Sequence, residues 1–203
     1  MAAITAGAIF VTSYLISPVT GVRVEGNRMF PAADAWEAIP DHASLLTLNT
    51  KSVEREIESN LWVEGTEVTK NWDSGIVTVQ VEERSAVMDA ELAGRRAIFA
   101  LDGTELPGLG GASLGSVRLD GDQLEDILKS GKVLRDNGVS LDSIDAVDAG
   151  GIRATVEGRS VVFGGVVRAG QARALPGVMD RHPDAPLFDL RSPERIVVGE
   201  RNG

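Results

Sequence analysis

The sequence predicts an α+β protein that begins with an apolar helix, and three observations lead to this prediction. Residues 1–21 contain no charged side chain. Residues 22–84 show strand-like and helix-like patterns in the order strand, helix, helix, strand, strand. Residues 85–203 consist mainly of short strand patterns between turn residues, with one clear helical pattern. Strands and helices grouped in this way are typical of α+β proteins.

Residues 1–19 are predicted to form a transmembrane anchor. The stretch from Ala2 to Ile16 is mostly apolar and approaches the roughly 17 to 25 residues that a membrane-spanning helix requires, and Pro18 would end the helix. A cleaved signal peptide is one alternative, although it calls for a basic flank before the apolar core. A buried core helix is the other, although an apolar run without a polar face has little to pack against in a small soluble protein.

Short-range patterns define the first strand and the first helix of residues 20–84. Apolar and charged residues alternate from Val22 to Glu25, and the Gly26-Asn27 pair then forms a turn. Pro31 suits the first turn of a helix that ends at Pro40. One side of this helix is expected to carry Ala35, Trp36 and Ile39.

A second helix and a hairpin complete this segment. Asn49 or Thr50 can cap the helix, and its apolar residues recur every four positions. Residues 67–72 and 76–84 form the hairpin, whose second strand has three valines on one face. Each helix has one apolar face, so both are expected to pack on a single face of a three-stranded sheet. The apolar residues concerned are Val53, Ile57 and Leu61 in the helix and Val77, Val79 and Val81 in the strand.

Residues 85–203 are predicted to form a β-rich domain with a few helices. The clearest helix spans residues 123–137, with leucines and isoleucine on its inner side and Gly138 just past its end. A shorter helix at 171–179 is expected to break at Pro176. The expected strands are 86–91, 96–101, 117–119, 144–147, 151–157 and 160–163, followed by a closing hairpin of residues 188–191 and 195–199.

The composition argues against several functions. A net charge of −10 opposes binding to nucleic-acid phosphates, which requires clustered lysine and arginine. The chain has no cysteine, which removes thiolate catalysis, cysteine-bound zinc and iron–sulfur clusters. Its two histidines, His42 and His182, lie beside turn residues, as solvated loop positions do. No cofactor and no metal ion are therefore predicted.

One catalytic motif matches by letter. Residues Gly111 to Gly115 fit the G-x-S-x-G nucleophile elbow, with Ser113 at its centre. The elbow requires a strand before the serine and a helix after it, whereas here a glycine-rich loop precedes it and a strand-like segment follows. His182 would have to be the base, and it has no evident orienting acid. A secreted serine hydrolase is thus the weaker alternative, and no catalytic residue is predicted.

The last strand offers a different function. Residues Ile196 to Val198 form an apolar β-branched run, and a terminal strand often lies at a sheet edge with unpaired backbone donors and acceptors. Such an edge can accept a strand from a partner, with backbone hydrogen bonds supplying affinity. The alternative is that the strand only closes the sheet, with its edge covered by Glu194, Arg195 and Glu200. The residues alone leave both interpretations open.

Three stretches of the sequence carry a resemblance to a known family. They are "VRVEGNRMF", "LLTLNTKSVEREIESNLWVEGTEVTKNW" and "VTVQVEERSAV", in this order after the apolar segment. They resemble the polypeptide-transport-associated (POTRA) domain of the bacterial cell-division family FtsQ, called DivIB in some groups. The resemblance implies a POTRA domain at residues 20–84 and an FtsQ-type β domain at 85–203. It also implies a single-pass protein of the bacterial inner membrane, with most of the chain extracytoplasmic and located at the division septum.

The resemblance further implies a non-enzymatic protein that links early and late division proteins. In this family the C-terminal part of the β domain binds the FtsB and FtsL partners, or DivIC and FtsL. An aromatic residue often follows the arginine of the family motif, whereas Ser192 stands here, which shifts weight to backbone contacts. A POTRA-bearing chaperone or transport accessory is the alternative function. The positions that match the partner-binding motif are Asp189, Leu190, Arg191, Ile196, Val197, Val198 and Gly199.

Overall fold

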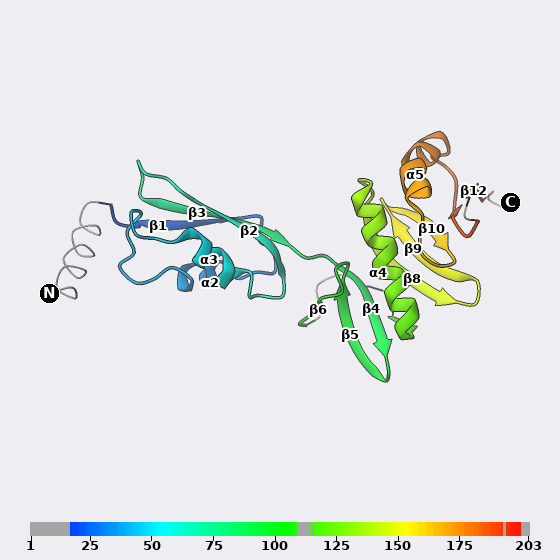
Figure 1. The fold of residues 1–203 in the computed structure, drawn as a ribbon, viewed down its shortest axis with the longest axis horizontal. Helices are drawn as coiled ribbons and strands as arrows, with labels where there is room; N and C mark the ends of the chain where they lie inside the picture. Colours follow the sequence, from blue (N-terminus) through cyan, green and yellow to red (C-terminus); the bar gives the residue numbers. More distant parts are fainter. Residues whose placement is uncertain (1–16, 109–113, 115, 193, 200–203) are drawn as a thin grey trace. The chain divides into compact units, whose positions relative to one another are not determined.

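The computed structural model describes residues 17–108, 114, 116–192 and 194–199 of the chain. The chain divides into two compact units between Arg84 and Ser85 (Figure 1). Each unit has its own sheet or sheets and its own buried apolar cluster.

The first unit has the predicted order of strand, helix, helix, strand, strand. It forms a three-stranded sheet in the order β1-β3-β2, in which β3 is the central strand. β1 runs parallel to β3, and β2 pairs with β3 in the antiparallel direction. Asn49 caps α3 by accepting a hydrogen bond from the Ser52 amide at 3.3 Å, as one of the two predicted caps. The elements are β1 (Gly21–Glu25), α2 (Ala32–Glu37), α3 (Thr50–Ile57), β2 (Val63–Lys70) and β3 (Ile76–Glu83).

Most of the residues predicted to form the core of this unit are buried. Val77, Val79 and Val81 of β3 are buried, and they belong to one apolar cluster with residues of both helices. Two predicted core residues lie elsewhere, because Trp36 is 50% exposed and Leu61 is 49% exposed. Helix α3 ends at Ile57, so the four-residue repeat that places Leu61 inward does not continue that far.

The second unit begins with a four-stranded sheet in the order β6-β5-β4-β7, followed by a long helix. The helix α4 is capped by Asp120, whose carboxylate accepts from the Gln123 amide at 2.8 Å, while the Asp120 amide donates to Gln123 Oε1 at 3.0 Å. The elements are β4 (Ala86–Leu92), β5 (Arg95–Ala100), β6 (Glu105–Leu106), β7 (Ser116–Leu119) and α4 (Gly121–Asp136).

A five-stranded sheet in the order β12-β11-β10-β9-β8 completes the second unit. β11 runs parallel to β10, because α5 connects them, and β12 returns antiparallel to β11. Both helices contribute to the buried cluster, with Ile127 and Leu134 from α4 and Leu175 and Met179 from α5. The elements are β8 (Leu141–Asp148), β9 (Gly151–Val156), β10 (Arg159–Phe163), α5 (Ala169–Arg181), β11 (Phe188–Asp189) and β12 (Val197–Val198).

The expected fold class needs one correction, which concerns the transmembrane anchor at residues 1–19. Residues 1–16 lie outside the described part of the chain. Among the helices that the structure describes, none combines the length and the apolar character needed to cross a membrane. The last three residues of the expected anchor are backbone-paired within the first unit: the Val19 amide donates to Ala43 O at 3.0 Å, and Ser17 O accepts from the Leu45 amide at 2.8 Å. The α+β class therefore stands, and its transmembrane helix is withdrawn.

Candidate functional site at the edge of the C-terminal sheet

Strand β12 lies at one end of the five-stranded sheet. Among the strands that the structure describes, it has a neighbour on one side only, which is β11. The predicted closing hairpin is therefore observed, although its connection runs from Leu190 to Ile196 and is longer than a tight turn. The edge position that strand addition requires is present.

The register shows which backbone groups of β12 face outward. Phe188 lies opposite Val198, Asp189 lies opposite Val197, and the Gly199 amide donates to Leu187 O at 2.8 Å. In an antiparallel pair, the residues that exchange hydrogen bonds alternate with residues whose backbone groups point away from the partner strand. Val197 and Gly199 therefore face β11, whereas the N–H and C=O groups of Val198 face the open side of the sheet.

The side chains of this segment also alternate. Ile196 and Val198 are half-buried and pack against the core of the second unit, whereas Val197 is 42% exposed. Gly199 leaves little space for a side chain, since a Cβ atom there would lie 3.3 Å from both Cβ and O of Leu187. The segment is thus held against the sheet by apolar contacts while one row of its backbone groups faces away.

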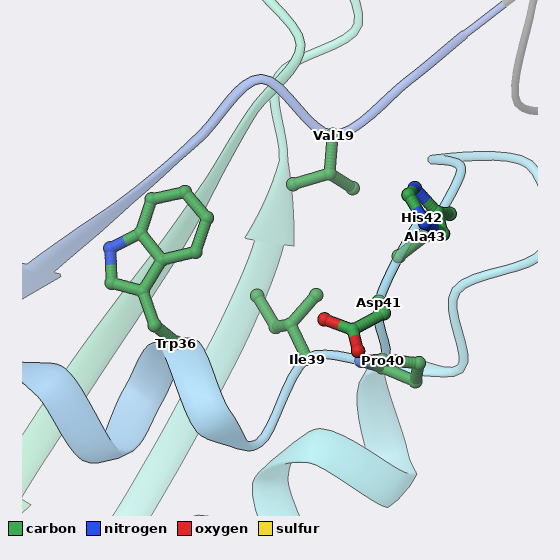
Figure 2. A pocket seen from close by; sticks show the side chains of 7 residues that line it. All are labelled: Val19, Trp36, Ile39, Pro40, Asp41, His42 and Ala43. Carbon is green, nitrogen blue, oxygen red and sulfur yellow. The ribbon is translucent and has the colours of Figure 1, made fainter.

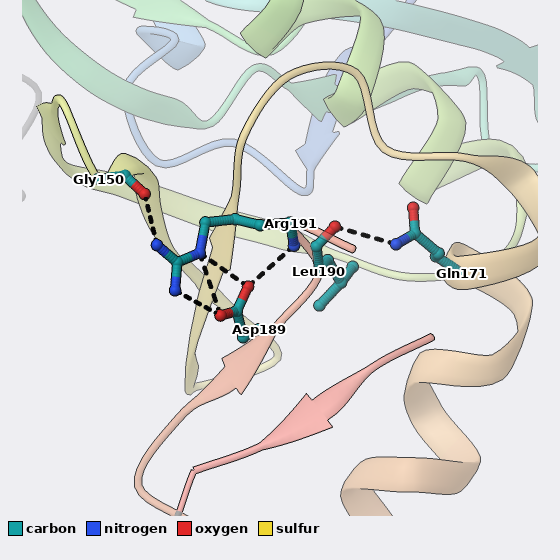
Figure 3. Close-up of polar contacts among 5 residues, drawn as sticks. All are labelled: Gly150, Gln171, Asp189, Leu190 and Arg191. Atoms are coloured by element: carbon teal, nitrogen blue, oxygen red, sulfur yellow. Dashed lines mark hydrogen bonds and ion pairs between the residues drawn. The ribbon is translucent and has the colours of Figure 1, made fainter. Parts of the chain in front are cut away.

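Asp189, the last residue of β11, and Arg191 form an ion pair (Figure 3). The guanidinium contacts the carboxylate at 2.6 Å, and the Arg191 amide donates to the same carboxylate at 2.9 Å. Arg191 also donates to the carbonyl of Gly150, between β8 and β9, at 3.1 Å. The hydrogen bond from Arg191 holds the pKa of Asp189 below its usual range, against partial burial, which would raise it. Arg191 therefore links the end of β11 to the turn between β8 and β9.

Gln171, on α5, is a functional candidate that the sequence analysis missed. Its side chain is buried, and its amide nitrogen donates to Leu190 O at 3.0 Å and to Ser192 O at 2.7 Å. Its amide oxygen accepts from the Arg168 amide at 3.1 Å. Gln171 therefore fixes the start of the connection that leads to β12 (Figure 3). A glutamine at the third position of a helix gives a capping signal in the sequence, but nothing in the sequence indicates the bonds to residues 190 and 192.

The seven predicted partner-binding residues are brought together in part. Asp189 and Val197 lie opposite each other in the sheet, and Leu190 donates its amide to Val162 O of β10 at 2.7 Å. Leu190 is buried, so its side chain supports the core of the unit. Val197 and Arg191 are exposed. Partner binding by these residues stays a prediction.

The hydrolase alternative rests on residues that the structure describes only in part. His182 is the C-terminal cap of α5, and its backbone amide donates to the carbonyls of Val178 and Met179. Ser113 lies outside the described residues, so the distance between the two side chains is not defined.

A pocket in the first unit is smaller than a usual ligand site. Its volume is about 150 Å³, whereas pockets for small molecules typically measure about 300 to 1,000 Å³. The Trp36 ring stands on one side of it and the loop after α2 on the other (Figure 2). The strand edge of the second unit is therefore a better candidate site than this pocket. The pocket is lined by Val19, Trp36, Ile39, Pro40, Asp41, His42 and Ala43.

Comparison with known proteins identifies the first unit. Residues 17–84 match the family model described as "POTRA domain, FtsQ-type", which confirms the resemblance found in the sequence. The comparison with curated proteins gave no match. FtsQ-type POTRA domains are found in a family of non-enzymatic division proteins, so the match indicates a role in cell division, at the septum and with other division proteins as partners.

Proposed function

Because residues 17–84 form a POTRA domain of the FtsQ type, we propose that this chain is a divisome assembly protein that binds an FtsB- or FtsL-type partner at the β12 edge. Residues 85–203 would then be the β domain of this protein, and the chain would connect early and late division proteins at the septum.

The open edge of β12 is the observation that supports the proposal. A partner strand that pairs with β12 accepts a hydrogen bond from the Val198 amide and donates one to the Val198 carbonyl. The exposed Val197 side chain offers an apolar contact to side chains of the added strand that lie on the same face of the sheet. Backbone pairing explains how binding tolerates Ser192 in place of the aromatic residue that the family often has.

The experiment compares two substitutions at Val198. Val198→Pro removes the outward N–H, whereas Val198→Ala shortens the side chain and keeps the N–H. Binding of a purified FtsB-type partner should weaken about tenfold or more in the proline variant, since one backbone hydrogen bond and the close approach of the strand are lost. The alanine variant should stay within about threefold of the original chain, a change of under about 1 kcal/mol. Equal affinities of the two variants would overturn the proposal.

The position of the proline matters for this experiment. The Val197 amide faces β11, so proline at 197 removes a bond inside the sheet and tests the folding of the sheet instead of the docking of a partner.

A fluorescent fusion of the full-length protein distinguishes a role in division from the alternative of a transport accessory. A division protein gathers at the septum, and a transport accessory spreads around the envelope.

A further inference from the structure

The POTRA sheet has a long free edge of its own. Strand β2 has eight residues and lies at the end of the β1-β3-β2 sheet. The Asn71 amide donates to Ile76 O at 2.8 Å, and this bond shows which opposite residues of β2 and β3 exchange backbone hydrogen bonds and which do not. In this register, Glu67 and Thr69 exchange hydrogen bonds with β3, so the amides of Thr66, Val68 and Lys70 point away from the sheet. These are the donors that an added strand would use.

Two of these donors are already bonded to carboxylates, one from α3 and one from the C-cap residue of α3. The Thr66 amide donates to Glu58 Oε1 at 3.1 Å, and the Val68 amide donates to Glu54 Oε1 at 3.2 Å. Alternate residues of a strand are about 6.7 Å apart, and residues four apart on a helix are separated by about 6 Å along the axis. The spacing of Glu54 and Glu58 therefore matches the spacing of the two amides that they cover.

Glu54 is held in its charged form at this position. It is 6% exposed and forms an ion pair with Lys51 at 2.6 Å. The hydrogen bond from Lys51 lowers the pKa of Glu54, burial opposes this, and the bond from the Val68 amide lowers it further. Charged side chains at an edge strand are a recognised means of preventing unwanted strand pairing.

We infer that Glu54 and Glu58 close the β2 edge against an added strand. A strand that approached this edge would bring its carbonyl oxygens to the places that the two carboxylate oxygens occupy. It would have to displace both carboxylates, one of which is buried and ion-paired. When both carboxylates are removed, the exposed edge pairs with the same edge of a second copy of the chain, since each copy then presents the same outward donors.

The test uses the full chain with both glutamates replaced, Glu54→Met together with Glu58→Met. At protein concentrations low enough to keep this variant monomeric, the amides of Thr66 and Val68 should exchange with solvent about tenfold faster or more, because each loses a charge-assisted hydrogen bond. The variant should also form a dimer whose amount rises with protein concentration in sedimentation. Adding Thr66→Pro, which deletes one outward donor at an edge position that tolerates proline, should return the chain to the monomer.

The matched control is Glu37→Met together with Glu56→Met, which removes the same charge from two exposed positions. This variant should stay monomeric with unchanged exchange at Thr66 and Val68. Tryptophan fluorescence checks that the unit remains folded, since all three tryptophans of the chain, at positions 36, 62 and 72, lie in it. Should Glu54→Met unfold the unit, Glu58→Ala alone, at an exposed residue, should still accelerate exchange at Thr66.

Two results would overturn the inference. One is unchanged exchange at Thr66 and Val68 in the folded double variant under monomeric conditions, which would show that the carboxylates do not protect these amides. The other is faster exchange in a variant that stays monomeric at every concentration, which would show that the free edge does not pair.

Discussion

Replacing Gln171 by methionine should loosen the segment that carries β12 while the rest of the second unit stays folded. The change keeps the length and approximate volume of the side chain. It removes three hydrogen bonds, of which two hold the carbonyls of Leu190 and Ser192. The expected effect is therefore local, at the connection from β11 to β12.

The magnitude follows from a comparison with a second glutamine. Gln123 occupies the same third position in α4 and accepts from the Asp120 amide at 3.0 Å, as Gln171 accepts from the Arg168 amide at 3.1 Å. Gln123→Met therefore loses the capping bond alone, and Gln171→Met loses the capping bond and two more. At about 1 kcal/mol for each bond, the additional cost is about 2 kcal/mol, which corresponds to a factor of about thirty in an opening equilibrium.

Hydrogen exchange at Gly199 is the appropriate assay. The Gly199 amide donates to Leu187 O across the β11–β12 pair, so its exchange rate reports the opening of β12. Gln171→Met should raise this rate about thirtyfold over that in the Gln123→Met variant. Tryptophan fluorescence does not serve here, because the three tryptophans lie in the first unit.

Equal exchange rates at Gly199 in the two variants would refute this prediction. That result would show that the bonds from Gln171 to residues 190 and 192 do not hold β12 in place. Global unfolding of the Gln171→Met variant would appear as faster exchange in β8 to β10 as well, and would contradict the local character of the effect.

Two further predictions concern the stability of each unit. The Glu83 carboxylate accepts hydrogen bonds from the backbone amides of residues 28–30 at 2.7 to 2.8 Å. Glu83→Ala should therefore lower the unfolding free energy of the first unit by about 2–3 kcal/mol, measured by urea unfolding followed by tryptophan fluorescence. Glu82→Ala, at an exposed neighbour, should cost under about 0.5 kcal/mol, and equal losses in the two variants would contradict the prediction. In the second unit, the hydrogen bond from Arg96 lowers the pKa of buried Asp89. A lowered pKa gives stability that is present above the unfolded value of about 3.9 and is lost as the pH falls through the folded value. Acid titration followed by circular dichroism should therefore show a steeper loss of stability below about pH 4 in the original chain than in Asp89→Asn, and identical slopes would argue against the pair.

The fold of the first unit was predictable because its signals are local. The alternation of Val77, Val79 and Val81 places them on one face whatever the rest of the chain does. The same kind of argument misplaced Trp36, since a helix of six residues can turn an aromatic side chain to solvent at its edge. Periodicity thus identified the elements better than the limits of their buried faces.

Helix α5 shows where tertiary packing overrides a local rule. Pro176 was expected to break the helix, yet α5 continues from Ala169 to Arg181 with this proline inside. Leu175 and Met179, on either side of it, are buried in the core of the second unit. Their burial offsets the missing backbone bond, because most helical stability in proteins comes from the packing of the apolar face.

The strand of the candidate site could be predicted from the sequence, whereas the hydrogen bonds that hold it in place could not. The β-branched run at residues 196–198 indicated a strand at the end of the chain, and that strand does lie at an edge. The bonds from Gln171 to the β11–β12 connection, and those from Glu54 and Glu58 to β2, join residues that sequence patterns do not relate. Such contacts depend on how elements pack, and only the three-dimensional arrangement shows them.

Hydrogen exchange of the chain with and without a saturating FtsB-type partner tests the docking of a strand at β12 most directly. We expect the partner to slow exchange at the Val198 amide, which faces outward, and to leave exchange at the Gly199 amide, which is already bonded to Leu187, nearly unchanged. Slowing at Gly199 without slowing at Val198, or protection confined to other parts of the chain, would contradict pairing at this edge.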